Sequence, residues 1–155
     1  SPQTVDYGTD GSLVTATPAT GYHFVSWSDG YPTAARTDMN VTANITVSAS
    51  FAINTYTLTY SAGANGSIVG TSPQTVDYGT DGSLVTATPT TGYHFVSWSD
   101  GYPTAARPDM NVTADITVTA TLAINTYTLT YSAGANVSIV CTTHQTLHSC
   151  THGTL

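Results

Sequence analysis

A histidine, a serine and an aspartate occur close together at two places in the chain. The two sets are His23, Ser26 and Asp29, and His94, Ser97 and Asp100. These are the residue types of the Ser–His–Asp hydrolases, in which the histidine takes a proton from the serine nucleophile. However, each set is crowded onto one expected strand and its following turn, with neither a nucleophile elbow nor an oxyanion loop nearby. We therefore expect no catalytic residues here, and we place both histidine rings on the solvent face of their strands.

Paired aspartates are the second group of candidate residues, because oxygen-rich loops bind calcium. The segment DYGTDG supplies Asp6 and Asp10 in the first part of the chain, and Asp77 and Asp81 in the second. Their spacing does not match an EF-hand, and Asp-Gly is first of all a turn signal. We therefore expect these carboxylates to cap turns, and we assign no metal and no cofactor to the chain.

Cysteines and histidines crowd the last part of the chain, at Cys141, His144, His148, Cys150 and His152. Alone, this set predicts a zinc site or a Cys141–Cys150 disulfide. In the repeat described below, the same positions are Gly70, Pro73, Asp77, Gly79 and Asp81. Each replacement needs one base change, and that change is always a transversion. We therefore interpret residues 137–155 as poor sequence data or a decayed repeat end, rather than as a selected site.

Two aromatic pairs and several asparagines are candidates for recognition at the surface. The aromatic residues are Trp27, Tyr31, Trp98 and Tyr102, whose rings could form a platform on which a sugar stacks; the other interpretation places the tryptophans in the core and the tyrosines over them as a loop cover. Glycosylation sequons begin at Asn40, Asn44, Asn65, Asn111 and Asn136, and they matter only in a secreted protein of a suitable host.

The composition limits the partners and favours strands. The chain has 2 basic residues, both arginine, 9 acidic residues, all aspartate, and a formal net charge of -7. Two arginines cannot neutralise a run of phosphates, so we expect neither nucleic acid nor an anionic membrane surface as a partner. No apolar stretch reaches the roughly 18 residues of a transmembrane helix, and no leader opens the sequence. Abundant threonine and tyrosine, without lysine or glutamate, favour strands over helices.

An internal repeat of 71 residues organises the chain. SPQTVDYGTDGSLVTATP begins at Ser1 and Ser72, GYHFVSWSDGYPTAAR at Gly21 and Gly92, and INTYTLTYSAGAN at Ile53 and Ile124. If units begin at Ser1, the chain holds two complete copies and a stub. We prefer a start at Ile53, which gives a truncated copy over residues 1–52, a complete unit over 53–123 and a partial, divergent copy over 124–155.

Each unit contains short segments with the alternating pattern of half-buried strands. In the complete unit we expect strands over residues 55–61, 67–69, 74–78, 83–88, 93–98 and 116–122, with a short edge strand over 110–113. Residues 104–107 could form one helical turn at most. The expected core residues are Leu58, Tyr93, Phe95, Trp98, Val118 and Leu122. The sequence therefore predicts an all-β, mainly antiparallel fold of tandem modules, arranged as beads on a string.

The same segments resemble the divergent internalin B-type repeat, also called the bacterial repeat domain. The resemblance rests on a YTLT strand at Tyr56, an ATP-x-x-GY-x-F-x-x-WS core from Ala87 to Ser99, and a closing strand from Val118 to Leu122. The first copy carries Phe51 where the second has Leu122, and Phe51 is closer to the family pattern. The resemblance implies a small β-grasp-like domain or sandwich of bacterial or archaeal surface and secreted proteins, and it implies no catalytic residues.

The residues and the resemblance together predict a non-catalytic structural or stalk repeat, in a fibre or array, of a secreted or cell-surface protein. The alternative is an adhesive or carbohydrate-binding module that uses exposed aromatics. Expected partners are neighbouring repeats, copies of the chain itself, a surface glycan or a host protein, without direct membrane insertion. Incomplete units at the two ends of the chain expose unpaired strand edges, which favours self-assembly by strand addition.

Overall fold

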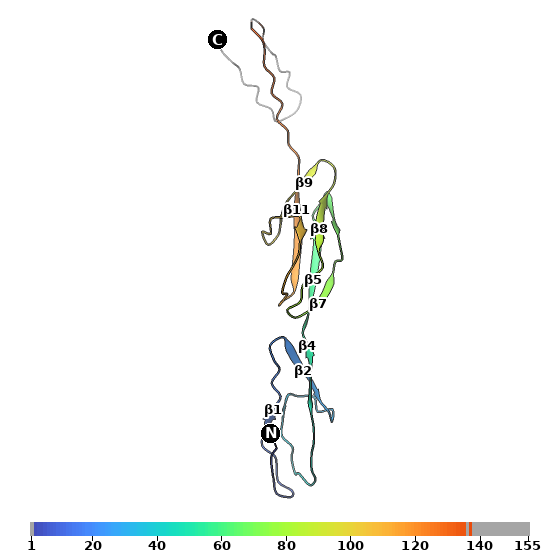
Figure 1. Ribbon diagram of the computed structural model, residues 1–155, viewed down its shortest axis with the longest axis vertical. Helices are drawn as coiled ribbons and strands as arrows, with labels where there is room; N and C mark the ends of the chain where they lie inside the picture. The colour runs from blue at the N-terminus through green and yellow to red at the C-terminus, as the bar shows by residue number, and fades with distance from the viewer. Residues whose placement is uncertain (1, 136, 138–155) are drawn as a thin grey trace.

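The computed structural model describes residues 2–135 and 137 as two β modules joined end to end along one axis (Figure 1). No described residue is helical, and nearly all strand pairs are antiparallel, so the predicted all-β class is confirmed. We call residues 2–53 the first module and residues 55–124 the second module. Within the described residues, no helix is long and apolar enough to cross a membrane.

The second module is built from seven strands in two sheets. In chain order they are β5 (Thr55–Ala62), β6 (Gly66–Val69), β7 (Gln74–Asp77), β8 (Val85–Pro89), β9 (Tyr93–Trp98), β10 (Ala106–Arg107) and β11 (Ile116–Ile124). A four-stranded sheet has the order β7-β5-β11-β9, and a three-stranded sheet has the order β10-β8-β6. The module is thus a small sandwich whose first and last strands, β5 and β11, are neighbours.

The pair formed by β5 and β11 is parallel, unlike every other strand pair of the described residues. Its register runs from Leu58 beside Ile116 to Ala62 beside Ala120. Parallel neighbours need a long connection between them, and here the intervening strands β6 to β10 provide it. A sequence pattern of period 2 shows that a strand is half-buried but not which strand it pairs with, so this parallel pair could not be read from the repeat.

The core lies between the two sheets and is centred on Trp98, Leu58 and Val85, which are almost fully buried. The expected core residues Leu58, Trp98 and Val118 are buried, and Phe95 and Leu122 are half-buried. Tyr93 lies outside this core cluster. The residues that sequence reasoning left out of the core are Tyr60, Val85, Ala87, Val112 and Ala120. Two of them, Val85 and Ala87, lie on β8, and all five lie within segments that were predicted to be strands.

One expectation about local structure is wrong. Residues 110–113 form no strand, because Asn111 has a φ of 48° and this left-handed conformation interrupts an extended chain. Val112 instead turns into the core and exchanges backbone hydrogen bonds with the turn after β7, from Gly79 N to Val112 O at 2.7 Å and from Val112 N to Thr80 O at 2.9 Å. Residues 104–107 form no helical turn, since their second half is strand β10, paired with β8.

The first module contains fewer strands than the second. They are β1 (Val14–Thr15), β2 (Tyr22–Trp27), β3 (Ala35–Arg36) and β4 (Ala49–Ile53), which form the pairs β1-β3 and β2-β4. These strands lie at the positions of β8, β9, β10 and the end of β11, 71 residues earlier. The 155 residues contain no first-module counterpart of β5 and β6, and residues 3–6 and 45–48, which correspond to β7 and the start of β11, form no strand.

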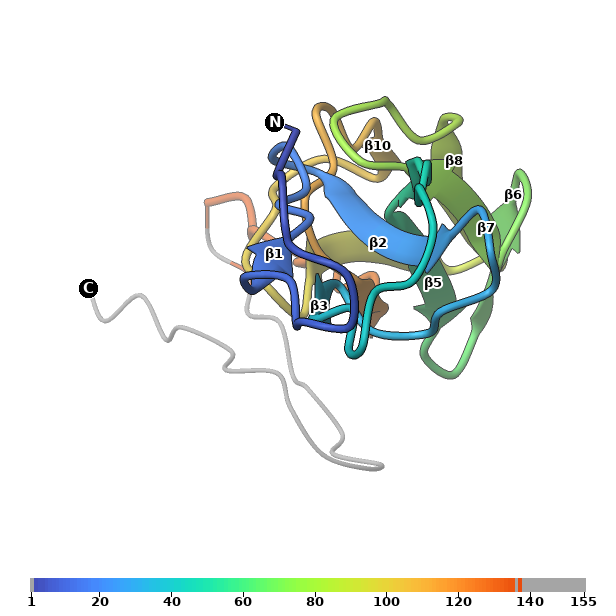
Figure 2. The same cartoon turned by 90° about the horizontal axis from the view of Figure 1, so that it is seen from below.

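A single residue, Asn54, separates the modules. Its backbone N–H donates to Gly21 O and its backbone carbonyl accepts from Tyr78 N, both at 2.8 Å, and its side-chain Oδ1 lies 2.8 Å from Nδ1 of His23. The ring of Tyr78 lies so close to Gly21 that a Cβ there would be 2.3 Å from Tyr78 Cδ1. Only glycine allows this approach. Figure 2, seen from below, shows the modules one behind the other. Strand β4 ends at Ile53 and β5 begins at Thr55, so the chain passes from one to the other through Asn54 alone, as Figure 1 shows.

Candidate functional site

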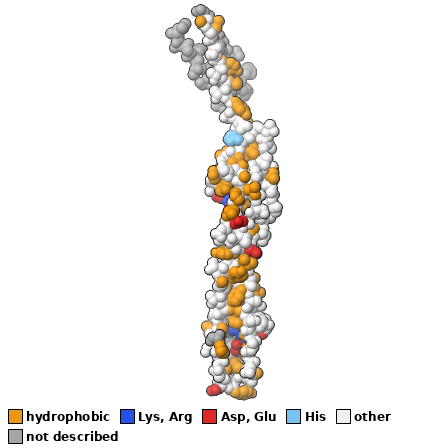
Figure 3. Space-filling model, in the orientation of Figure 1, with side chains coloured by type: hydrophobic (Ala, Val, Ile, Leu, Met, Phe, Trp, Pro, Cys, Tyr) orange, Lys and Arg blue, Asp and Glu red, His pale blue; other side chains and the backbone are white. Residues whose placement is uncertain are grey.

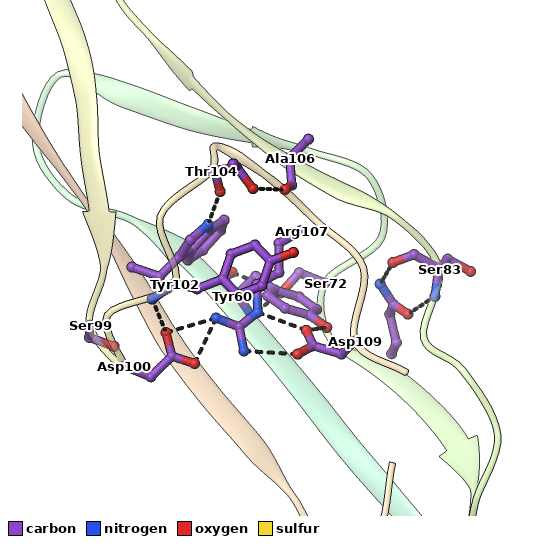
Figure 4. A network of polar contacts seen from close by, with 12 residues as sticks. Tyr60, Ser72, Ser83, Ser99, Asp100, Tyr102, Thr104, Ala106, Arg107 and Asp109 are labelled. Carbon is purple, nitrogen blue, oxygen red and sulfur yellow. Dashed lines mark hydrogen bonds and ion pairs between the residues drawn. The ribbon is translucent and has the colours of Figure 1, made fainter. Parts of the chain in front are cut away.

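The most elaborate arrangement of polar side chains surrounds Arg107 in the second module (Figure 4). Its guanidinium carbon lies 5.7 Å from the ring centroid of Trp98 and 5.1 Å from that of Tyr102. Nε and NH2 each donate to one oxygen of Asp109 at 2.8 Å, and NH1 lies 2.7 Å from an oxygen of Asp100. We call Arg107, Trp98, Tyr102, Asp100 and Asp109 the arginine cluster.

The loop between β9 and β10 holds the arginine cluster in place. Asp100 and Gly101 begin this loop, with Gly101 at a φ of 85°, and Asp100 Oδ1 accepts from the backbone N–H of Tyr102 at 3.2 Å. The indole Nε1 of Trp98 donates to Thr104 O at 3.0 Å. The buried tryptophan therefore fixes the loop, and the loop in turn brings Asp100 to Arg107.

A tyrosine from β5 completes the arginine cluster. The hydroxyl of Tyr60 donates to Asp109 Oδ2 at 2.6 Å, and its ring packs edge-on against Trp98 with centroids 6.0 Å apart. Burial, and then the hydrogen bond to Asp109, raise the pKa of Tyr60 above its ordinary range, so its hydroxyl stays a donor. Since β5 and the segment that follows β10 are far apart in sequence, this bond ties the start of the module to its later part.

Both aspartates remain charged in this setting. Burial alone would raise the pKa of Asp109, but hydrogen bonds from Arg107 and Tyr60 hold it below its ordinary value. The same balance, with Arg107 and the Tyr102 backbone as donors, lowers the pKa of Asp100. The hydrogen bond to Asp109 raises the already high pKa of Arg107. Asp100, Asp109 and Arg107 are therefore charged near neutral pH, and they form ion pairs with one another. None of the three is free to donate a proton to a substrate or to accept one from it.

The first module repeats the arginine cluster, but without a counterpart of Tyr60. Arg36 lies 5.2 Å from the ring centroid of Trp27 and 5.0 Å from that of Tyr31, and it pairs with Asp29 at 3.0 Å and Asp38 at 2.5 Å. Its Nε is buried and has no hydrogen-bond partner, whereas the corresponding atom of Arg107 is bonded to Asp109. The cluster of the first module therefore lacks the second hydrogen bond between arginine and aspartate, which Nε makes in the second module.

The structure does not bring the two sets of His, Ser and Asp together. His23 is exposed and its Nδ1 faces Asn54, while His94 is exposed with its Nδ1 2.9 Å from Oδ1 of Asn125. The aspartates point elsewhere, since Asp29 and Asp100 are bound to arginines. Ser26 bonds to Ser50 across the pair β2-β4, and Ser97 lies on β9. The two histidines thus hold the asparagines that follow the last strand of each module.

The paired aspartates flank turns, and Asp77 is the last residue of β7. Asp10 and Asp81 each accept a hydrogen bond at 2.8 Å from the backbone N–H of an asparagine, Asn40 and Asn111 respectively. The backbone carbonyls of Asp6 and Asp77 accept from the threonines that follow them, Thr9 and Thr80. Among the described residues no three His, Cys, Asp or Glu side chains converge as they would around a metal ion. The cysteines and histidines at 141–152 lie outside the described residues.

The aromatic pairs are divided between the core and the surface. Trp98 is 1% exposed and Trp27 is also buried, so neither indole presents its face to solvent. Tyr31 is exposed and Tyr102 half-buried, and each covers the arginine beneath it. Of the sequon asparagines, Asn40, Asn44, Asn65 and Asn111 are exposed, and Asn136 lies outside the described residues.

The sequence analysis did not identify the arginine cluster. A usable signal was present, since the only two cations of the chain stand at equivalent repeat positions, each with an aspartate two residues later and another seven residues earlier. In a chain with so few charges, this spacing marks each arginine as paired. The contribution of Tyr60 had no such signal, because it depends on how β5 lies in the sandwich.

Comparison with known proteins gives one family. The family model described as the divergent InlB B-repeat domain matches the chain twice, over residues 1–55 and over residues 56–126. No curated protein and no solved structure matches the chain.

Proposed function

The chain belongs to the divergent InlB B-repeat domain family, and from this premise we propose that it is a non-catalytic stalk segment that transmits load along its axis. The family is typical of bacterial surface proteins. On a cell surface, a rod of such modules holds whatever it carries at a distance and bears the tension between the two ends.

The observation that carries this proposal is the path of the chain through the second module. The chain enters on β5 and leaves on β11, and these strands are parallel neighbours in the centre of the four-stranded sheet. Tension applied at Thr55 and Ile124 therefore drags one strand past the other. All hydrogen bonds of the register from Leu58 to Ala62 share the load at once, whereas a hairpin pulled at its open end loses its bonds one after another.

The junction supports the same role. Asn54 is bonded to the backbone of both modules, and the ring of Tyr78 fills the space over Gly21. A linker of one residue with these contacts leaves little freedom for bending, in contrast to the flexible linkers that separate independent domains. The arginine cluster adds no reactive group, since its charges are mutually satisfied in the second module.

Single-molecule pulling tests the proposal directly. In a background with Cys141 and Cys150 replaced by serine, one variant carries attachment cysteines at Thr55 and Ile124, and the matched control carries them at Thr55 and Asp77. Thr55 and Asp77 are register partners at the same end of the pair β5-β7, so the control is peeled open. We expect a several-fold higher unfolding force along the natural axis. Equal forces in the two geometries would refute the load-bearing role.

The adhesive alternative has less support from the side chains. The tryptophans are buried, and an arginine lies over one ring face of each tyrosine, so Tyr31 and Tyr102 each offer at most one open face to a sugar. Stacking on several open aromatic faces is thus not available here, and the stalk is the function that we propose.

A further inference from the structure

We propose that the arginine cluster is a second load-bearing connection between β5 and β11, which carries tension across the sandwich alongside their hydrogen-bonded register. The connection matters only if tension acts on these two strands, so this inference rests on the proposed stalk role. It deepens that role by naming the side chains that set the force at which the second module opens.

The connection begins on β5 at Tyr60. This residue lies beside Val118 in the middle of the parallel register, so it moves with β5 when the two strands are pulled apart. Its ring is buried, and its hydroxyl donates to Asp109 Oδ2 at 2.6 Å. Asp109 lies just beyond β10, which is a strand of the other sheet. Any slip of β5 along β11 therefore stretches a bond that joins the two sheets.

The backbone of Tyr60 is also held from outside the β5-β11 pair. The pairing of β5 with β7 ends at Leu58, and beyond it Ser72 bonds to both backbone groups of Tyr60. Ser72 Oγ accepts from Tyr60 N at 2.7 Å and donates to Tyr60 O at 2.8 Å. Because these bonds fix the orientation of the residue, Tyr60 cannot turn to keep its hydroxyl on Asp109 while β5 slips.

From Asp109 the connection continues through Arg107 to the end of β9. Asp109 receives two hydrogen bonds at 2.8 Å from Arg107, one to each carboxylate oxygen. Arg107 also reaches Asp100, with NH1 2.7 Å from a carboxylate oxygen. The dashed lines in Figure 4 follow this path from Tyr60 to Asp100. Paired hydrogen bonds between arginine and a carboxylate are strong and directional, so the path is stiff at its centre.

The connection ends on β11. Asp100 follows Ser99, whose backbone N–H donates to Thr119 O at 2.9 Å and whose Oγ accepts from Thr119 N at 3.1 Å. Strand β9 itself pairs with β11 over most of its length. The path from Tyr60 to β11 thus uses none of the hydrogen bonds between β5 and β11.

The centre of the connection is shielded from water. The side chain of Arg107 is 4% exposed and that of Asp109 is 11% exposed. On the face drawn in Figure 3, the surface is mostly white and orange, and the few blue atoms lie beside red ones. Salt screens buried charge pairs much less than exposed ones. The connection should therefore keep its strength at the ionic strength outside a cell.

Constant-force pulling of the second module tests the connection, with the attachment cysteines at Thr55 and Ile124 described above. Tyr60→Phe removes the bond to Asp109 and keeps the ring packed against Trp98. At a given force we expect this variant to unfold about tenfold faster, which is the factor that a loss of about 1.4 kcal/mol gives in a rate.

A variant with a similar loss of chemical stability separates load bearing from ordinary stability. Ile68→Ala, on β6 of the three-stranded sheet, shortens a half-buried side chain that packs against the core. This truncation should lower the urea midpoint roughly as much as Tyr60→Phe does, but β6 lies outside the path between β5 and β11. Contacts that are still intact at the transition state do not change the unfolding rate, so we expect Ile68→Ala to unfold less than about threefold faster.

The path is a series of contacts, so breaking it at either end releases it. Asp100→Asn weakens the end at β9, on a side chain that is 43% exposed, and should also speed unfolding under load. The double variant with Tyr60→Phe should unfold no faster than Tyr60→Phe alone, whereas independent contacts give multiplied rates. Asp29→Asn, the same change in the first module, is the matched control and should leave the second module unchanged.

The outcomes either support or overturn this connection. Equal acceleration by Tyr60→Phe and Ile68→Ala, an unchanged rate in Tyr60→Phe, or multiplied rates in the double variant overturns it. The stalk role fails on a different result, namely equal unfolding forces of the unaltered module in the two pulling geometries, and the connection then fails with it. If the unaltered module resists tension along its axis and Tyr60→Phe resists it equally well, only the connection fails.

Discussion

Removal of one hydroxyl group, in Tyr60→Phe, tests whether the arginine cluster stabilises the second module. The hydroxyl donates to Asp109 Oδ2 at 2.6 Å, and Asp109 is a half-buried carboxylate that also binds Arg107. A hydrogen bond to a charged acceptor contributes about 1.5–3 kcal/mol. Because Arg107 still satisfies the carboxylate, we expect a loss near the lower end, about 2 kcal/mol. With an m-value of about 1 kcal/mol/M for a domain this small, the urea midpoint falls by about 2 M.

The repeat supplies the control for this measurement. Tyr131→Phe makes the same change 71 residues later, where the tyrosine is exposed, and it should leave the midpoint of the second module unchanged. Unfolding is followed by the fluorescence of Trp98, in a Trp27→Phe background and at a concentration where single chains prevail. If Tyr60→Phe and Tyr131→Phe shift the midpoint equally, or neither shifts it, the hydroxyl does not contribute to stability and the reasoning fails.

Three further predictions concern the core, the charges and the junction. Leu58→Ala removes a fully buried side chain and should cost about 2–5 kcal/mol in chemical unfolding, whereas Leu129→Ala should cost the single chain nothing. Because the pKa of Asp109 is lowered in the folded module, its carboxylate stabilises the second module above the ordinary aspartate pKa of about 3.9, and this stabilisation is lost as the pH falls below about 4. The urea midpoint should therefore drop between pH 5 and pH 3. The drop should be smaller in Asp109→Asn. Tyr78→Ala empties the space over Gly21 and should broaden the distribution of distances in small-angle X-ray scattering without changing the stability of either module.

The sequence predicts most of the strands because their signals are local. The alternation in Thr55–Ala62 and the aromatic run in Tyr93–Trp98 identify β5 and β9, and the composition favours strands over helices. Residues 110–113 mislead because hydrophobic Met110 and Val112 alternate there, yet the left-handed Asn111 between them prevents a strand. Which strands become neighbours is a matter of long-range packing, so the parallel pair β5-β11 is not encoded in any short pattern.

The candidate site is harder to read from the sequence than the fold. Aromatic residues such as Trp98 and Tyr102 are equally suited to a core and to a sugar platform, and only their burial decides between the two. The histidines drew attention as catalytic candidates, yet His23 and His94 each face the asparagine that follows a module. The types and spacing of residues do not show the direction of a side chain. The structural role of the two histidines becomes visible only when Asn54 is seen to join β4 to β5.

The position of β5 makes the 71-residue sequence repeat differ from the folded module. The 71-residue repeat can be cut anywhere without changing its period, but the sandwich needs β5, which continues directly from β4 through Asn54. The second module therefore begins with its central strand, which follows the last strand of the first module after one residue. In repeat arrays the stability of a unit depends on its neighbours, and here the dependence is concentrated in one strand. In the second module this strand carries Leu58 and Tyr60 into the core and pairs with both β7 and β11, so the residues next to the junction complete the fold.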